Sequence, residues 1–286
     1  MLVLALDSSA TASVALARID SDAPGASAEI LASYESEDTR SHAEVMAPYA
    51  AQVLADTGLD GAAVDAVLTG IGPGPFTGLR AGIMTARTLG FAWDKPVYGL
   101  MSLTAIVERA FADGAFRDSL TAANNGMNRA AHETLVASDA RRREIYCALF
   151  AVTENGYSLA SGPSVGPAHQ THAPAYDPSD LAAPALGYGA GLYTEALTAS
   201  GWDVLKDYAQ LHPTAADLVK AAARGGMKNL SRDTQALYLR ESDAKVPAAL
   251  LARTTSAQPP HGQQNTGEPQ KTRGQQPAPA APAREQ

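Results

Sequence analysis

The chain has 286 residues, a formal net charge of -8 at pH 7 and a single cysteine, Cys147. This length is enough for one large or two small domains with a sizeable core. The negative net charge argues against a protein that binds nucleic acid by itself, because neutralising phosphates requires clustered Lys and Arg. The single cysteine excludes an internal disulfide, and its alternating apolar surroundings predict a buried small hydrophobe.

The N-terminal stretch 1–17 is apolar enough to imitate a secretory signal. It lacks a basic start, however, and Asp7 interrupts it. No uninterrupted apolar stretch elsewhere reaches membrane-spanning length. The sequence therefore predicts a cytoplasmic protein without a membrane association.

Three short strands are predicted at 2–6, 12–19 and 30–35. Turn-rich links join them, which predicts an antiparallel meander. A helix is predicted to open at Ser41, because Ser41 and Glu44 have the spacing of a capping box.

From Val64 the pattern changes to an alternation of strands and helices. The predicted elements are a strand at 64–71, a glycine loop, a helix at 78–93, a strand at 96–100 and a helix at 102–112. Alternation of this kind predicts a parallel extension of the sheet. Three antiparallel strands followed by such alternation are typical of the ribonuclease-H-like half of actin-type ATPases and sugar kinases. We therefore expect an α/β, actin-like ATPase fold with two subdomains, the second one reduced; the fold alone does not fix the function.

Further strands are predicted at 134–138, 144–152 and 158–165, and a strand running into a helix over 185–199. The helix predicted at 214–224 either stays with these elements or returns to the first subdomain. The expected domains are an N-terminal subdomain (1–112), a polar inter-domain loop (113–133), a smaller C-terminal α/β subdomain (134–252) and a disordered tail (253–286). The tail is rich in Gln, Pro, Gly and Ala, so it cannot bury enough apolar surface to fold.

The most informative motif is the glycine loop after the strand at 64–71. It reads Gly72-Pro73-Gly74-Pro75-Phe76-Thr77-Gly78-Leu79-Arg80. It is not a P-loop, because no Gly-Lys-Ser/Thr follows, and it fails the dinucleotide fingerprint, whose third glycine would fall at Thr77. Glycines between a strand and a helix still allow close approach of another backbone or of a phosphate.

Asp7, Ser8 and Ser9 follow the first strand, where ATPases of this architecture hold a phosphate and a metal-bound water. Together with Gly72 and Gly74 they are candidate nucleotide-binding residues. The alternative is an ordinary strand-end turn that is capped by Asp and Ser side chains.

Small residues recur every four positions along the helix after the glycine loop, at Gly78, Gly82, Ala86 and Gly90. Such a stripe permits very close packing, either on the chain's own sheet or against another chain. A second cluster, Arg141-Arg142-Arg143, is either a solvated strand entry or a patch for tRNA or an acidic partner.

No constellation for metal binding or covalent catalysis is visible. No two histidines stand at i, i+4 on one helix, and no Ser lies in a Gly-x-Ser-x-Gly turn. We therefore predict no metal site and no catalytic residue on this chain.

Four motifs resemble one known family. They are Leu4-Ala5-Leu6-Asp7-Ser8-Ser9, Ser41-His42-Ala43-Glu44, the Pro-Phe-Thr-Gly-Leu-Arg run of the glycine loop, and Ser102-Leu103. They are similar to those of the bacterial TsaB (YeaZ) family, the dimerization subunit of the complex that makes tRNA threonylcarbamoyladenosine. The resemblance is strong over residues 1 to about 110 and thinner beyond. Pro75 stands where the family usually has Ser, which removes a hydroxyl and an amide that could contact an anion.

The resemblance implies a non-catalytic subunit that binds a catalytic paralogue, TsaD, and an ATPase subunit, TsaE. Transfer RNA would be bound only through the complex, the free chain could form a homodimer, and ATP or ADP could bind at the interface with the partner. The positions that correspond to the metal-binding histidines of the paralogue are Ser102 and Ile106, which cannot replace imidazole. The resemblance also implies a helical bundle with the partner, and the expected interface residues are His42, Met46, Tyr49, Ala50, Val53, Gly78, Gly82 and Ala86.

Two rival functions remain open on the sequence. One is an autonomous ATPase or small-molecule kinase that uses Asp7 and the glycine loop. The other is a protease, which the lack of a paired nucleophile and base disfavours.

Overall fold

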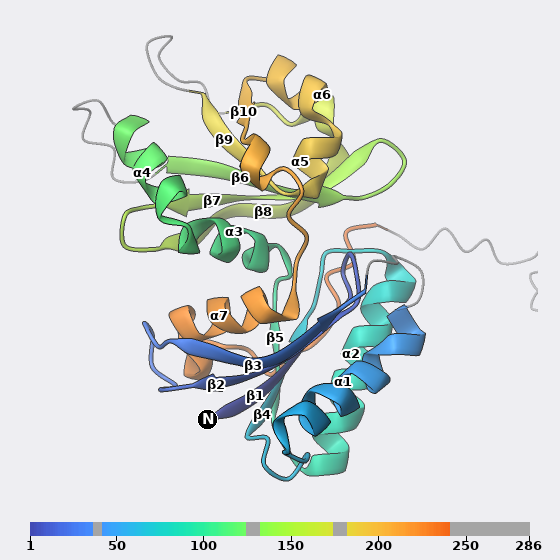
Figure 1. Cartoon of the computed structure of the whole chain (residues 1–286). Helices are drawn as coiled ribbons and strands as arrows, with labels where there is room; N and C mark the ends of the chain where they lie inside the picture. Colours follow the sequence, from blue (N-terminus) through green and yellow to red (C-terminus); the bar gives the residue numbers. More distant parts are fainter. Residues whose placement is uncertain (37–41, 124–131, 174–181, 241–286) are drawn as a thin grey trace, which may run out of the picture. The chain divides into compact units, whose positions relative to one another are not determined.

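Two five-stranded sheets organise the chain (Figure 1). The computed structural model describes residues 1–36, 42–123, 132–173 and 182–240. Sheet A has the strand order β3-β2-β1-β4-β5 and sheet B the order β10-β9-β6-β7-β8. The strands of sheet A are β1 (Leu2–Asp7), β2 (Ser13–Ile19), β3 (Ala28–Glu35), β4 (Ala66–Gly70) and β5 (Val97–Leu100). The strands of sheet B are β6 (His132–Asp139), β7 (Glu144–Val152), β8 (Tyr157–Pro167), β9 (Ala183–Leu186) and β10 (Trp202–Val204).

Helices cover both sheets. The α-helices are α1 (His42–Thr57), α2 (Phe76–Trp93), α3 (Leu103–Ala112), α4 (Gly114–Ala123), α5 (Tyr188–Leu192), α6 (Thr194–Ala199) and α7 (Ala215–Gly225). Short 3-10 turns are η1 (Ala168–Gln170), η2 (Lys206–Tyr208) and η3 (Met227–Asn229). The start that was predicted for the first helix, Ser41, lies outside the described residues.

Strand β1 lies at the centre of sheet A. It pairs antiparallel with β2, where Leu4 faces Leu16, and parallel with β4, where Leu4 faces Val67. Sheet A continues antiparallel from β2 to β3 and parallel from β4 to β5. The predicted meander and its parallel extension are confirmed.

Alternate residues of β1 point to opposite faces of sheet A, and a different helix layer covers each face. Leu4 packs with Met46 of α1 and Ala86 of α2. Val3 packs on the other side with Leu218 of α7. Helix α7 follows sheet B in the chain, so the question left open by the sequence is answered: this helix returns to sheet A.

Sheet B is likewise buried on both faces. Ile106 of α3 packs with Phe150 of β7 on one face. Trp202 of β10 and Leu197 of α6 pack with Cys147 of β7 on the other. Cys147 is 5% exposed, which confirms its predicted burial.

Two stretches differ from the sequence expectation. Residues 114–123, predicted as part of a loop, form helix α4, because Phe116 and Leu120 stand one turn apart and are buried in the same cluster as α3; residues 124–131 lie outside the described part. The strand predicted over 185–191 ends at Leu186, since Gly187 has a φ of +94° and starts helix α5.

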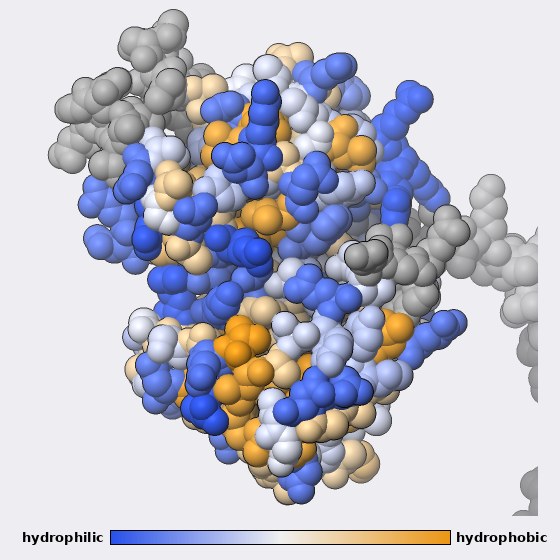
Figure 2. All heavy atoms as spheres, in the orientation of Figure 1, coloured by the Kyte–Doolittle hydropathy of each residue, from blue (hydrophilic) through white to orange (hydrophobic). Residues whose placement is uncertain are grey.

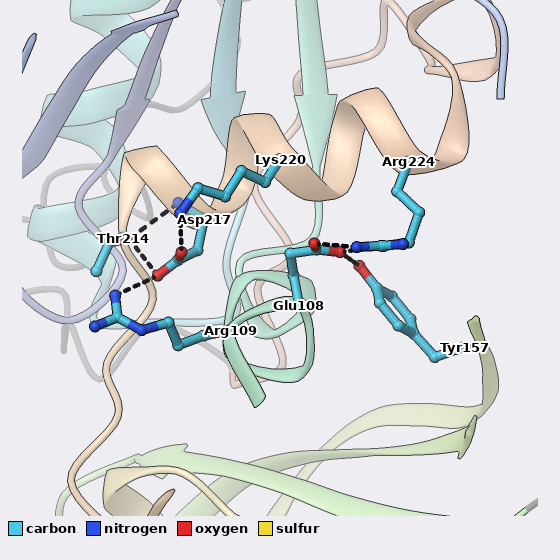
Figure 3. A network of polar contacts seen from close by, with 7 residues as sticks. All are labelled: Glu108, Arg109, Tyr157, Thr214, Asp217, Lys220 and Arg224. Carbon is cyan, nitrogen blue, oxygen red and sulfur yellow. Dashed lines mark hydrogen bonds and ion pairs between the residues drawn. The ribbon is translucent and has the colours of Figure 1, made fainter. Parts of the chain in front are cut away.

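A network of buried charges joins α3, α7 and β8 (Figure 3). Glu108 of α3 is 2% exposed, and its carboxylate accepts two hydrogen bonds from Arg224 of α7, at 2.7 and 2.8 Å, and one from the Tyr157 hydroxyl of β8, at 2.7 Å. Two turns earlier on α7, Asp217 pairs with Arg109 and Lys220, each at 3.2 Å. The network ties α3 to a helix of sheet A and to a strand of sheet B.

Within the described ranges, no helix combines the length and apolar character that crossing a membrane requires.

Candidate functional site

Asp7 ends β1 and is fully buried. Its Oδ1 accepts hydrogen bonds from the Ser9 amide at 2.8 Å and the Ser9 hydroxyl at 2.6 Å. Its Oδ2 accepts the hydroxyl of Ser102, at the start of α3, at 2.6 Å. The carboxylate therefore holds the turn after β1 and anchors α3 to it.

Ser8 joins the same turn to helix α2. Its hydroxyl donates to the Gly78 carbonyl at 2.7 Å and accepts the Gly82 amide at 3.1 Å. A Cβ on Gly82 would collide with Ser8 Oγ, so glycine at this position lets the helix approach the strand end.

The glycine loop packs directly on the turn. The Gly72 amide donates to Ser102 Oγ at 3.1 Å, and its φ of +95° favours glycine. A Cβ on Gly74 would strike the backbone of Ser9. The glycine loop and the turn after β1 thus fill the space between them. A phosphate can enter this space only if the loop or the turn moves.

Of the five candidate nucleotide residues, Asp7, Ser8, Gly72 and Gly74 serve this packing, and Ser9 reaches a cavity. A pocket of about 310 Å³ lies above the turn and receives side chains from the ends of both sheets. Its lining residues are Ser9, Ala10, Thr11, Pro75, Asp139, Arg141, Tyr188 and His212. A ligand of these motifs would have to bind in this pocket.

The polar groups of the pocket are one ion pair, hydroxyls and an imidazole. Asp139 and Arg141 pair at 3.4 Å, and the His212 ring lies 4.4 Å from the Tyr188 ring. Burial lowers the pKa of the His212 imidazole, although Asp139 acts in the opposite direction. His212 is therefore neutral at pH 7, and its buried Nδ1 has no hydrogen-bond partner among the described residues. None of the residues lining the pocket pairs a nucleophile with a base.

No group of three or more His, Cys, Asp and Glu residues that could hold a metal occurs in the part of the chain that the structure describes. Burial also raises the pKa of the Cys147 thiol, which disfavours the reactive thiolate.

Most of the expected interface residues lie inside the chain. Six of the eight are buried: Met46, Ala50, Val53, Gly78, Gly82 and Ala86. Tyr49 is half-buried and stacks on Tyr34, while His42 begins α1 and its side chain lies outside the described part. The small-residue stripe of α2 faces the chain's own β1 turn, α1 and β5, so any partner has to meet the opposite face of the helix.

Comparison with known proteins adds to this geometry. The model of the family described as "TsaD: tRNA N6-adenosine threonylcarbamoyltransferase" matches residues 29–172, which is half of the chain. YeaZ from Pseudomonas aeruginosa has a TM-score of 0.63 and 27% identity, and the match covers 83% of this chain and 99% of that one. The chain belongs to this family, as a TsaB (YeaZ)-type member.

Two curated relatives match this TsaB-type chain over shorter stretches. The tRNA threonylcarbamoyladenosine biosynthesis protein TsaB of Haemophilus influenzae is 36% identical over 107 residues, which are 37% of this chain and 39% of that protein. An uncharacterized protein of Mycobacterium tuberculosis is 43% identical over 113 residues, which are 40% of this chain and 44% of that protein. The matches therefore span less than half the length of these relatives. The YeaZ likeness and the family match confirm the predicted actin-like, ribonuclease-H-like α/β fold.

In this TsaB-type chain, the two positions that are expected to correspond to the paralogue's histidines have structural roles. Ser102 donates to Asp7, and Ile106 is buried in the core of sheet B. Neither side chain can ligate a metal as imidazole does.

Proposed function

We propose that this chain is a non-catalytic subunit in the synthesis of threonylcarbamoyladenosine in tRNA. It binds a catalytic paralogue of the TsaD type and is required for threonylcarbamoyl transfer to the adenosine next to the anticodon of tRNAs that read A-starting codons. The family membership supports this proposal, and so does the similarity to the tRNA threonylcarbamoyladenosine biosynthesis protein TsaB of Haemophilus influenzae. A TsaE-type ATPase subunit and a homodimer of the free chain belong to the same proposal, as does a cytoplasmic location.

The closed packing around Asp7 supports a role without catalysis. Its carboxylate is fully buried and engaged by Ser9 and Ser102, so it cannot reach a bound nucleotide as the base of a kinase would. An autonomous ATPase would need this turn and the glycine loop to separate.

The main observation in favour of a partner is the outer face of α2. Three large apolar side chains on this helix are exposed: Phe76 at 38%, Met84 at 55% and Phe91 at 91%. Phe76 begins the helix, and Met84 and Phe91 lie two turns apart on the side away from Gly82 and Ala86, which are buried. Single exposed apolar residues are ordinary, but a row along one helix marks an interaction surface.

A groove beside this row is lined by cations and apolar side chains. It has a volume of about 360 Å³ between α2 and residues 234–238. Arg80 Nε donates to the Tyr238 hydroxyl at 3.0 Å and Arg87 Nε to Thr234 Oγ1 at 2.7 Å, so both walls are held in place. The Phe76 and Tyr238 rings pack at 4.6 Å. The groove fits a helix of the partner that presents apolar side chains and carboxylates.

The test is the mass, by light scattering, of the purified chain alone and mixed with the catalytic paralogue of the same genome. We expect a heterodimer that the double variant Met84→Glu/Phe91→Glu weakens at least about tenfold, because large interface side chains commonly dominate binding. The control is Leu159→Glu/Leu192→Glu, which changes two side chains that are each 48% exposed on other elements. A variant at Ala50, one of the expected interface residues, does not suit this test. Ala50 is 2% exposed, so the carboxylate of Ala50→Glu would disturb the core instead of the interface.

A heterodimer that only the α2 variant loses supports the proposal. Absence of any association, with steady ATP turnover by the chain alone, would overturn it in favour of the kinase.

A further inference from the structure

The turn between β6 and β7 has an unusual backbone. Arg141, Arg142 and Arg143 have φ values of 60°, 57° and 63°. L-residues other than Gly, Asn and Asp rarely enter this left-handed region, and then as single residues, not in runs. All three arginines are exposed. A turn that only needed to reverse the chain would be formed at lower free energy by glycine or asparagine.

The turn is fixed from both sides. The Arg141 amide donates to Asp139 Oδ1 at 2.8 Å, and the Glu144 amide donates to the Arg141 carbonyl at 3.0 Å. From a distant part of the chain, the Arg240 guanidinium donates to the Ala140 carbonyl at 2.9 Å and pairs with Glu144. Strain held by surrounding contacts of this kind is typical of functional positions.

The charge at the turn is opposite to that of the chain. Three consecutive arginines form the turn and the Arg240 guanidinium bonds to it, in a chain of net charge -8. Arg141 pairs with Asp139, and Arg240 with Glu144. Hydrophilic side chains dominate the surface of the sheet B region in Figure 2.

The side-chain directions favour an extended polyanion. Successive residues of a helical backbone of either hand point about 100° apart, so the three side chains leave the turn in different directions. Arginine side chains that point in different directions can each bind a different phosphate of one strand. A single carboxylate, by contrast, is bound by one guanidinium group that donates two parallel hydrogen bonds.

We propose that the Arg141–Arg143 turn binds the phosphate backbone of RNA. This inference rests on the proposed function, in which the RNA is the tRNA that the complex modifies. The acidic remainder of the chain explains why such a contact works only as part of a larger surface shared with the partner.

The experiment measures binding of an unmodified tRNA transcript to the complex with the catalytic paralogue, by fluorescence anisotropy over a series of salt concentrations. We expect Arg142→Ala/Arg143→Ala to flatten the slope of log affinity against log salt by about 1.4 to 1.8, because each phosphate contact contributes about 0.7 to 0.9. The control, Arg18→Ala/Arg232→Ala, removes two exposed arginines elsewhere and should keep the wild-type slope.

A second variant, Arg142→Gly/Arg143→Gly, excludes misfolding as the cause. Glycine suits the left-handed turn, so the same change of slope is expected without a lower Tm.

Unchanged slopes in both turn variants, with tRNA bound by the wild-type complex, would overturn the inference. Weaker association with the paralogue at an unchanged slope would also overturn it and assign the turn to an acidic protein surface. Complex formation is followed separately by light scattering, so the failure of the proposed function is a different result: no complex forms at all. In that case the inference, which depends on a surface shared with the partner, fails together with the proposed function.

Discussion

Single residues control how closely β1 and α2 approach each other. Ser8 Oγ bonds both the Gly78 carbonyl and the Gly82 amide, and Gly82 leaves no room for a further carbon. The cost of an interior helix glycine, roughly 1 kcal/mol relative to alanine, is offset by this contact.

Gly82→Ala should therefore destabilise the fold despite the better helix propensity of alanine. We expect a loss of about 1–3 kcal/mol in the free energy of unfolding, because the added methyl group overpacks the contact with Ser8. Gly225→Ala is the matched control at the end of α7, where an added Cβ meets nothing within 4 Å. Urea unfolding of both variants measures the difference. Equal stabilities would mean that the approach of α2 to the β1 turn is not close.

At the scale of elements, α3 and α7 are joined by ion pairs whose carboxylates are buried and whose cations are partly exposed. Glu108 is 2% exposed, and Arg224 and Tyr157 supply its hydrogen bonds. The Glu108 carboxylate also raises the pKa of the Tyr157 hydroxyl, although burial is the larger cause. A buried ion pair of this kind is costly to break from one side, since the remaining charge stays buried.

Arg224→Met should thus cost about 3–5 kcal/mol of unfolding free energy. The matched control is Arg18→Met, which breaks the surface pair with Glu29, whose side chains are 57% and 66% exposed, and should cost no more than about 1 kcal/mol. Thermal and urea unfolding both report the difference. If the two variants lose the same stability, Glu108 is hydrated in solution and the helices are held by apolar contacts alone.

On the scale of the whole molecule, the pocket above the β1 turn exists only when both sheets are assembled. Its His212 comes from the segment between sheet B and α7, whereas Ser9 follows the first strand. His212 lines this pocket, so its protonation makes the stability of the complete fold depend on pH.

The unfolding free energy should fall as the pH is lowered through the ordinary histidine pKa of 6.5. Burial lowers the pKa of His212 in the folded chain, so below this pH the unfolded chain binds the proton more readily. The contribution is fully present above pH 6.5 and is lost between 6.5 and the lower, folded pKa. His212→Asn should reduce the slope of stability against pH in this window, by at most about 1.4 kcal/mol per pH unit. Urea unfolding from neutral to mildly acidic pH provides the measurement, and identical slopes in the variant and the wild type would show that His212 titrates freely.

The sequence by itself determined the strands of sheet A, the helix after the glycine loop and the family. These follow from alternation over a few neighbouring residues and from a contiguous motif, which act locally. It also predicts that Ser102 and Ile106 stand where the catalytic paralogue has its metal-binding histidines. The disordered tail that was predicted from Arg253 onward lies outside the described residues.

Only the tertiary structure decided which face of α2 points outward. This helix has apolar residues on both sides, with Phe76, Met84 and Phe91 exposed and Leu79 and Ile83 buried, so no polar stripe marks the surface. The closure of the Asp7 turn, the return of α7 and the buried position of Glu108 likewise depend on contacts between residues that are from about 70 to more than 100 positions apart. Local pattern does not encode such contacts, because burial is a property of the assembled sheets and not of any single segment.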